Sequence, residues 1–187
     1  MEAGVWLVAR ASRVFNAEQV VGWEAPQRQY PVSIAEVIET VETFVAATKA
    51  EVNRAGLMAC YHIPGDYIEM PALARFTGSP TCTATEAYSA TLLHETVHWA
   101  GARHRLNRFG EVVSKADLAA EELVAEIGAA FLCADLGVSN QPRPDHAAYV
   151  ASWLRMLKND TRAIFTASRL ASQAAMFLHE LAAVNEP

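Results

Sequence analysis

The sequence has few cysteines, no excess of basic residues and no long hydrophobic run. Its 187 residues include only three cysteines, far apart and without a C-x-x-C pair, which excludes a disulfide framework and a cysteine-based zinc finger. Lys and Arg number 15 against 21 Asp and Glu, so nucleic acid is not expected as a partner of this acidic chain. No stretch approaches the roughly 18 apolar residues of a membrane-spanning helix. We therefore expect a soluble, cytoplasmic protein that does not contact membranes.

The composition indicates one folded domain. Hydrophobic residues make up 52% and charged residues 19%, enough apolar material for a core and too little charge for a disordered chain. The chain has no internal repeat, and its length fits a single domain over residues 1–187. Glu2 precedes the first apolar stretch, with Arg10 and Arg13 within or after it, which is the wrong order for a secretory signal.

The first half of the chain predicts a helix followed by a hairpin. Ser33 and Glu36 form a capping box ahead of apolar residues at helical spacing, which predicts a helix that ends near Gly56. A Pro-Gly-Asp turn lies between two short extended runs, 59–63 and 67–70, and predicts a β-hairpin.

The second half predicts helices. Thr83 and Glu86 form another capping box, and a later helix closes with Gly137 in the left-handed position. The expected helices cover residues 83–101, 117–136, 145–158 and 161–184. Strands come early and helices late, which favours an α+β fold over an alternating parallel sheet.

The strongest motif is His94-Glu95-Thr96-Val97-His98. Histidines at i and i+4 project from one helix face about 5–6 Å apart at Cβ, so both imidazoles can bind one zinc ion at about 2.0–2.1 Å. Glu95 lies about 100° further round the helix, beside the metal, where its carboxylate can take a proton from the attacking water.

Chance does not readily produce this motif. Six His and sixteen Glu in 187 residues give roughly 0.02 expected windows of this pattern. The alternative is a pair of core histidines bonded to backbone or carboxylate groups. Leu93 and Val97 on one side, and Leu92 and Trp99 on the other, place the pair in an enclosed environment where imidazoles need partners.

A catalytic zinc site needs a third protein ligand. In AAEELVAEIGAAFL, Glu122 and Glu126 share one inward-facing helix stripe, and a nearby dication would relieve the repulsion between them. We expect Glu122 as the ligand and Glu126 as the group that orients a histidine N–H. Glu121 or Glu126 is the alternative ligand, although a solvated acidic first turn explains Glu121 well.

His104 is a further candidate for the third ligand. HETVHWAGARH fits the metzincin pattern H-E-x-x-H-x-x-G-x-x-H, in which Gly101 would turn the chain and deliver His104. The required Met-turn is not identifiable, and an exposed histidine in the basic run Arg103, Arg105 and Arg108 is the alternative. That basic run is expected to cap the end of the active-site helix.

Two groups of residues complete the expected cleft. His146 and Tyr149 lie one helical turn apart and are candidate donors to the oxyanion formed during peptide hydrolysis; the alternative is packing of Tyr149 in the core. Residues 66–70 are a candidate edge strand for pairing with an extended substrate, with an ordinary hairpin strand as the favoured alternative.

Three segments also resemble a known family. HETVHWAGARHRLNR, EELVAEIGAAFLCADLG and DHAAYVASWLRMLKNDTRAIFTA resemble the C-terminal zincin-like metallopeptidase domain of ArdC-type antirestriction proteins, from about Phe15 to Leu181. The resemblance implies a small sheet and an active-site helix packed against a helical C-terminal lobe. It also implies Zn²⁺ as cofactor and a glutamate third ligand in the EELVAE segment, as in gluzincins.

The sequence departs from that family at two places. Family members often carry His-Pro-Ser where this chain has Ala102-Arg103-His104, which weakens His104 as a ligand. Full-length members also have an N-terminal domain that binds single-stranded DNA. This chain begins about where that domain would end, so residues 1–31 are expected to be a linker or a residual segment of it, and DNA binding is not carried over.

The sequence thus supports two functional hypotheses. The first is a zinc metallopeptidase, with zinc on His94, His98 and Glu122 and with Glu95 as general base, that cleaves a protein or peptide in a mobile-element or antirestriction context. The second is a zinc-containing binding module that blocks a defence protein without cutting it. A purely structural zinc with all positions closed is a weaker third possibility.

Overall fold

The computed structural model describes residues 20–22, 33–109, 115–138, 153–154, 157–158 and 160–185. Most of the predicted linker in 1–31 and of the predicted helix 145–158 therefore lies outside the described residues. The described elements are α1 (Ile34–Ala47), β1 (Glu51–Gly56), β2 (Cys60–His62), β3 (Tyr67–Pro71), a 3₁₀ turn (Leu73–Arg75), α2 (Ala84–Ala100), α3 (Lys115–Leu136) and α5 (Ala163–Asn185).

The three strands form one mixed sheet in the order β1-β3-β2. The predicted hairpin is confirmed: β2 and β3 pair antiparallel, with Tyr61 opposite Ile68. Residues 67–71 form an ordinary hairpin strand, the favoured interpretation, and not the candidate substrate-pairing edge, because β3 lies between two partners. β2 is the edge strand on the hairpin side of the sheet.

The first helix is shorter than predicted. It ends at Ala47, and Lys49 adopts a left-handed φ of 63° that turns the chain into β1. β1 pairs in parallel with β3, with Val52 beside Ile68. The local sequence of residues 50–56 suits a helix, but hydrogen bonds to a strand further along the chain determine its conformation.

Helix α2 is central to the described part of the fold. It packs against α1, α3, α5 and both strands of the hairpin. Thr83 and Glu86 form the predicted capping box at its start, and the helix ends at Ala100 as the sequence predicts. Gly137, with φ 74°, follows the end of α3 as expected.

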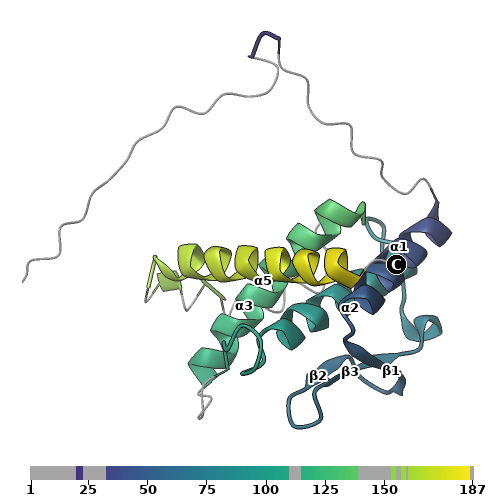
Figure 1. Cartoon of the computed structure of the whole chain (residues 1–187), viewed down its shortest axis with the longest axis horizontal. Helices are drawn as coiled ribbons and strands as arrows, with labels where there is room; N and C mark the ends of the chain where they lie inside the picture. Colours follow the sequence, from purple (N-terminus) through teal and green to yellow (C-terminus); the bar gives the residue numbers. More distant parts are fainter. Residues whose placement is uncertain are drawn as a thin grey trace, which may run out of the picture.

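The core lies between these helices and the inner face of the sheet. In Figure 1 the sheet lies below the helices, and α5 crosses α3, against which it packs. Alanines face inward along α5 and permit a close approach between the two helices. The largest fully buried side chains are Val41, Val45, Ile68, Met70, Leu92, Leu93, Val97, Val124, Leu132 and Leu178. This arrangement confirms the α+β prediction.

Within the described residues, none of the helices combines the length and the apolar character that a membrane span requires.

Candidate metal centre

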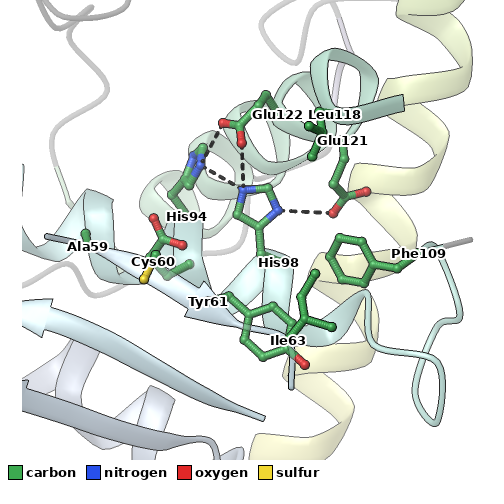
Figure 2. Close-up of a pocket in the computed structure, with 11 residues that line it drawn as sticks. Ala59, Cys60, Tyr61, Ile63, His94, His98, Phe109, Leu118, Glu121 and Glu122 are labelled. Atoms are coloured by element: carbon green, nitrogen blue, oxygen red, sulfur yellow. Dashed lines mark hydrogen bonds and ion pairs between the residues drawn. The ribbon is translucent and has the colours of Figure 1, made fainter. Parts of the chain in front are cut away.

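Helices α2 and α3 bring two imidazoles and one carboxylate together. The Nε2 atoms of His94 and His98 lie 3.1 Å apart. Glu122 from α3 places Oε2 3.4 Å from Nε2 of His94 and Oε1 3.5 Å from Nε2 of His98. Figure 2 shows the three side chains converging on one point. This group is the one that the described residues offer for a metal ion.

The donor set and its spacing fit zinc. Two ligand atoms that are each about 2.0–2.1 Å from a tetrahedral zinc ion lie about 3.3 Å apart. The three separations of 3.1, 3.4 and 3.5 Å fall close to that value. Three protein ligands also leave a fourth position, as in catalytic zinc sites.

Two more carboxylates of α3 face the opposite nitrogens of the imidazoles. Oε1 of Glu126 lies 3.6 Å from Nδ1 of His94, and Oε1 of Glu121 lies 3.2 Å from Nδ1 of His98. Each histidine is thus oriented by a carboxylate on the side away from Glu122. The solvated first-turn position favoured for Glu121 is wrong, because its side chain is only 11% exposed.

Close packing of α2 on α3 makes these contacts possible. A Cβ added to Gly128 would lie 3.0 Å from both methyl groups of Val97. A larger residue at position 128 would therefore require the buried Val97 side chain to shift by a few tenths of an ångström.

The electrostatics of the centre favour a positive charge between the imidazoles. Burial alone would lower the pKa of His98, but hydrogen bonds with Glu121 and Glu122 outweigh it and raise the pKa to about 9. Hydrogen bonds from His94 and His98 hold the pKa of Glu122 well below its usual range. A dication can take the place of the proton that these carboxylates attract.

Glu95 lies beside this group and is almost fully buried, at 7% exposure. Burial raises the pKa of its carboxyl, while a hydrogen bond with the backbone of Tyr61 acts in the opposite direction. Glu95, which the sequence assigns as general base, lines the same cavity as Cys60 and Tyr61 of the edge strand β2.

The centre opens into a cavity of about 260 Å³. One wall is the edge strand β2 and the residues next to it, and the rim opposite carries apolar side chains. The lining residues are Ala59, Cys60, Tyr61, Ile63, His94, Glu95, His98, Phe109, Leu118, Glu121 and Glu122.

The remaining predicted residues are placed differently. His104 is 62% exposed and lies 3.2 Å from the Asp66 carboxylate, apart from the His94–His98–Glu122 group. Gly101 caps α2 with a right-handed φ of −74°, and the chain after it places His104 beside Asp66, away from that group. His146 and Tyr149 lie outside the described residues.

The basic run caps α2 as predicted for two of its members. Arg105 donates to the carbonyl of Trp99 at 2.6 Å, and Arg108 donates to the carbonyl of Val97 at 2.5 Å. Both guanidinium groups also bind a carboxylate: Asp66 for Arg105 and Glu121 for Arg108. These carboxylate contacts had no signal in the sequence, because they join segments that are distant along the chain.

Comparison with known proteins identifies relatives. Residues 39–170 match a family described as zincin-like metallopeptidase. The chain is 41% identical over 174 residues to protein y4eC of Sinorhizobium fredii, covering 92% of this chain and 54% of that protein. It is 34% identical over 167 residues to the DNA primase TraC of Escherichia coli, covering 88% of this chain and 15% of TraC.

Solved structures agree with these sequence matches. The Mn(II)-bound crystal structure of the antirestriction protein ArdC from plasmid R388 superposes with a TM-score of 0.71 at 39% identity, covering 92% of this chain and 62% of ArdC. The metal-free ArdC structure gives a TM-score of 0.69 at 38% identity. The chain thus spans about half to two thirds of y4eC and ArdC. With its His/His/Glu group and the fold of ArdC, the chain belongs to the zinc-binding family of zincin-like metallopeptidases.

Proposed function

We propose that this domain is a zinc-dependent peptidase that hydrolyses peptide bonds of protein substrates, with His94, His98 and Glu122 as metal ligands. The observation that carries the proposal is the triangle of donor atoms, with edges of 3.1–3.5 Å, at the floor of an open cavity beside a buried glutamate. A purely structural zinc would not need that cavity or that carboxylate.

Glu95 is the proton carrier in the proposed reaction. A bound zinc ion supplies Lewis acidity toward the scissile carbonyl and the attacking water. The Glu95 carboxylate accepts the proton that the water loses as its oxygen bonds to the carbonyl carbon. The same carboxyl then donates that proton to the amine nitrogen as the carbon–nitrogen bond breaks. Glu95 lines the cavity beside His94 and His98, so its carboxyl is within the site for both transfers.

The walls of the cavity suggest how the substrate lies. β2 is an edge strand, so an extended peptide can add to it through main-chain hydrogen bonds. Ile63, Phe109 and Leu118 line the same cavity, and Ile63 and Leu118 are about half exposed. We propose a substrate that is extended across the centre, with an apolar side chain against these residues.

His146 and Tyr149 remain predicted oxyanion donors. Peptide hydrolysis develops negative charge on the carbonyl oxygen, and a side-chain donor near it typically contributes about 10²–10³ in rate. Under this proposal Tyr149→Phe slows peptide cleavage and leaves zinc content unchanged.

The decisive variant is Glu95→Gln. It keeps the shape of the side chain and the three metal ligands but cannot carry a proton. We expect the variant to bind one zinc ion, as the wild type does, and to lose peptidase activity. Mass spectrometry of a random peptide library incubated with each protein measures the cleavage. Equal cleavage by both proteins would overturn the mechanism.

The antirestriction context of ArdC suggests a second arm of the same experiment. If the chain protects incoming DNA from restriction in cells, loss of protection in Glu95→Gln favours catalysis. Protection that survives in a folded, zinc-loaded variant favours the binding module.

A further inference from the structure

Arg108 is a buried charged residue next to the centre, although it contacts neither histidine. Its side chain is only 4% exposed. Its Nη2 donates to the Val97 carbonyl of α2 at 2.5 Å and to Oε1 of Glu121 at 2.7 Å, and its Nε donates to Oε2 of Glu121 at 3.0 Å. One planar guanidinium thus donates hydrogen bonds to both oxygens of one carboxylate and to a carbonyl near the end of the active-site helix.

Glu121 links Arg108 to His98, a proposed metal ligand. Its Oε1, bound by Arg108, also lies 3.2 Å from Nδ1 of His98. A carboxylate held by two guanidinium donors only accepts, so Nδ1 of His98 is the donor in this pair. With Nδ1 carrying a hydrogen for Glu121, Nε2 of His98 is the nitrogen left to bind a metal ion between His94 and Glu122.

We propose that Arg108 is a positioning residue of the metal centre, which fixes the Glu121 carboxylate so that His98 presents Nε2 to the metal. This inference rests on the proposed metal centre, and it adds a residue that touches neither metal nor substrate.

Two further features of the structure concern the position of Arg108. Among the residues that the structure describes, its buried Nη1 has no hydrogen-bond partner, a condition that is rare for buried polar atoms. Gly101 also leaves the space that the guanidinium occupies, since a Cβ there would lie 2.7 Å from Nη2 and 3.0 Å from Cζ. Gly101 has an ordinary helical φ, so the close approach of Arg108 is the reason for a glycine.

Arg105 provides a matched control within the same loop. It also donates to a carbonyl at the end of α2, binds a carboxylate and is 9% exposed. Its carboxylate is Asp66 of the hairpin turn, which bonds to Tyr61 and pairs with the exposed His104, and not with His94, His98 or Glu122. A merely structural role for Arg108 would therefore give both arginines the same phenotype.

The test is a zinc titration of the metal-free chain against a chromophoric chelator, together with urea denaturation. We expect Arg108→Met to weaken zinc binding by about tenfold, the lower end of the effect of changing an outer partner. Arg105→Met should lower stability without changing zinc affinity. Arg108→Lys keeps the positive charge but lacks the planar guanidinium that binds both oxygens of Glu121. We therefore expect its zinc affinity to lie between those of the wild type and Arg108→Met.

Gly101→Ala tests the same idea with the arginine intact. Its added methyl group displaces the guanidinium, so zinc affinity should fall as it does in Arg108→Met. The φ of Gly101 is one that alanine adopts readily. It also replaces Arg108→Met if that variant does not fold. The absorption spectrum of bound Co²⁺ should change in both variants, because the orientation of one imidazole changes.

The outcomes separate this inference from the proposed function. Wild-type zinc affinity in Arg108→Met and Gly101→Ala, beside a large loss in Glu122→Ala, would overturn the role of Arg108 and keep the metal centre. Equal loss of zinc affinity in the Arg108 and Arg105 variants would also overturn it. No zinc binding by the wild type would instead reject the proposed function itself.

Discussion

At the scale of single residues, Tyr61 joins the hairpin to the end of the active-site helix. Its hydroxyl donates to Oδ1 of Asp66 at 2.8 Å and accepts from Arg105 at 3.2 Å. Arg105 in turn lies over the Trp99 ring, with its guanidinium carbon 3.7 Å from the ring centre. These contacts fix the edge strand relative to the end of α2.

This network makes a testable prediction about titration. Burial of the hydroxyl, followed by its hydrogen bond to Asp66, raises the pKa of Tyr61 to about 12 from an ordinary 10.0. The unfolded chain therefore loses this proton first, and stability falls as the pH rises from about 10 to about 12. Asp66→Asn removes the negative charge, so the pKa of Tyr61 should fall toward its ordinary value.

The measurement is the phenolate absorbance during an alkaline titration. Tyr61→Phe identifies the late-titrating tyrosine by its disappearance. An unchanged late transition in Asp66→Asn would contradict the contribution assigned to Asp66, because burial alone would then account for the raised pKa of Tyr61.

At the scale of elements, α2 presents the histidines and the general base in one rigid helix. Its start is fixed by a reciprocal cap, in which Oγ1 of Thr83 accepts from the Glu86 backbone at 3.2 Å and Glu86 accepts from the Thr83 backbone at 2.7 Å. Its end is fixed by Arg105 and Arg108. Both ends of the helix are therefore satisfied by side chains from outside its own turns or at its cap.

Thr83→Ala should lower stability and leave the metal centre unchanged. Removing such a cap costs about 1 kcal/mol of unfolding free energy, within a range of about 0.5–2 kcal/mol. Urea denaturation measures the loss, and zinc titration should show wild-type affinity. Ser33→Ala removes the same type of cap from α1 and serves as a comparison. A Thr83→Ala variant that lost zinc affinity would indicate that α2 unravels as far as the histidines.

At the scale of the whole molecule, a bound ion would link α2 to α3. The two histidines and Glu122 come from helices that otherwise meet through apolar packing around Gly128 and Val97. A ligand that binds only the folded state stabilises it by about 2.7 kcal/mol at one hundred times its dissociation constant. For a chain of this size that corresponds to about 5–10 °C in melting temperature.

We therefore expect zinc to raise the melting temperature of the metal-free chain and a chelator to reverse the rise. Thermal denaturation with and without zinc measures the shift. Glu122→Ala should lose most of it, whereas His104→Ala should keep it, because His104 is exposed beside Asp66. A shift that disappears in His104→Ala and persists in Glu122→Ala would support the metzincin alternative.

The sequence by itself determined the features that depend on neighbours along the chain. Helical spacing places His94, Glu95 and His98 in one element, and capping boxes and the Pro-Gly-Asp turn mark the starts of helices and the hairpin. The placement of Glu122 and Glu126 on one inward face also followed from spacing, because a helix repeats every 3.6 residues whatever surrounds it.

Only the tertiary structure decided which of these residues meet. It turned residues 51–56 into a strand against β3, left β2 as the edge, and brought Glu121 between His98 and Arg108. These contacts join residues at least ten positions apart, where local periodicity carries no information. The packing of α3 against α2 sets their distances, and with them the position of each carboxylate beside the histidines.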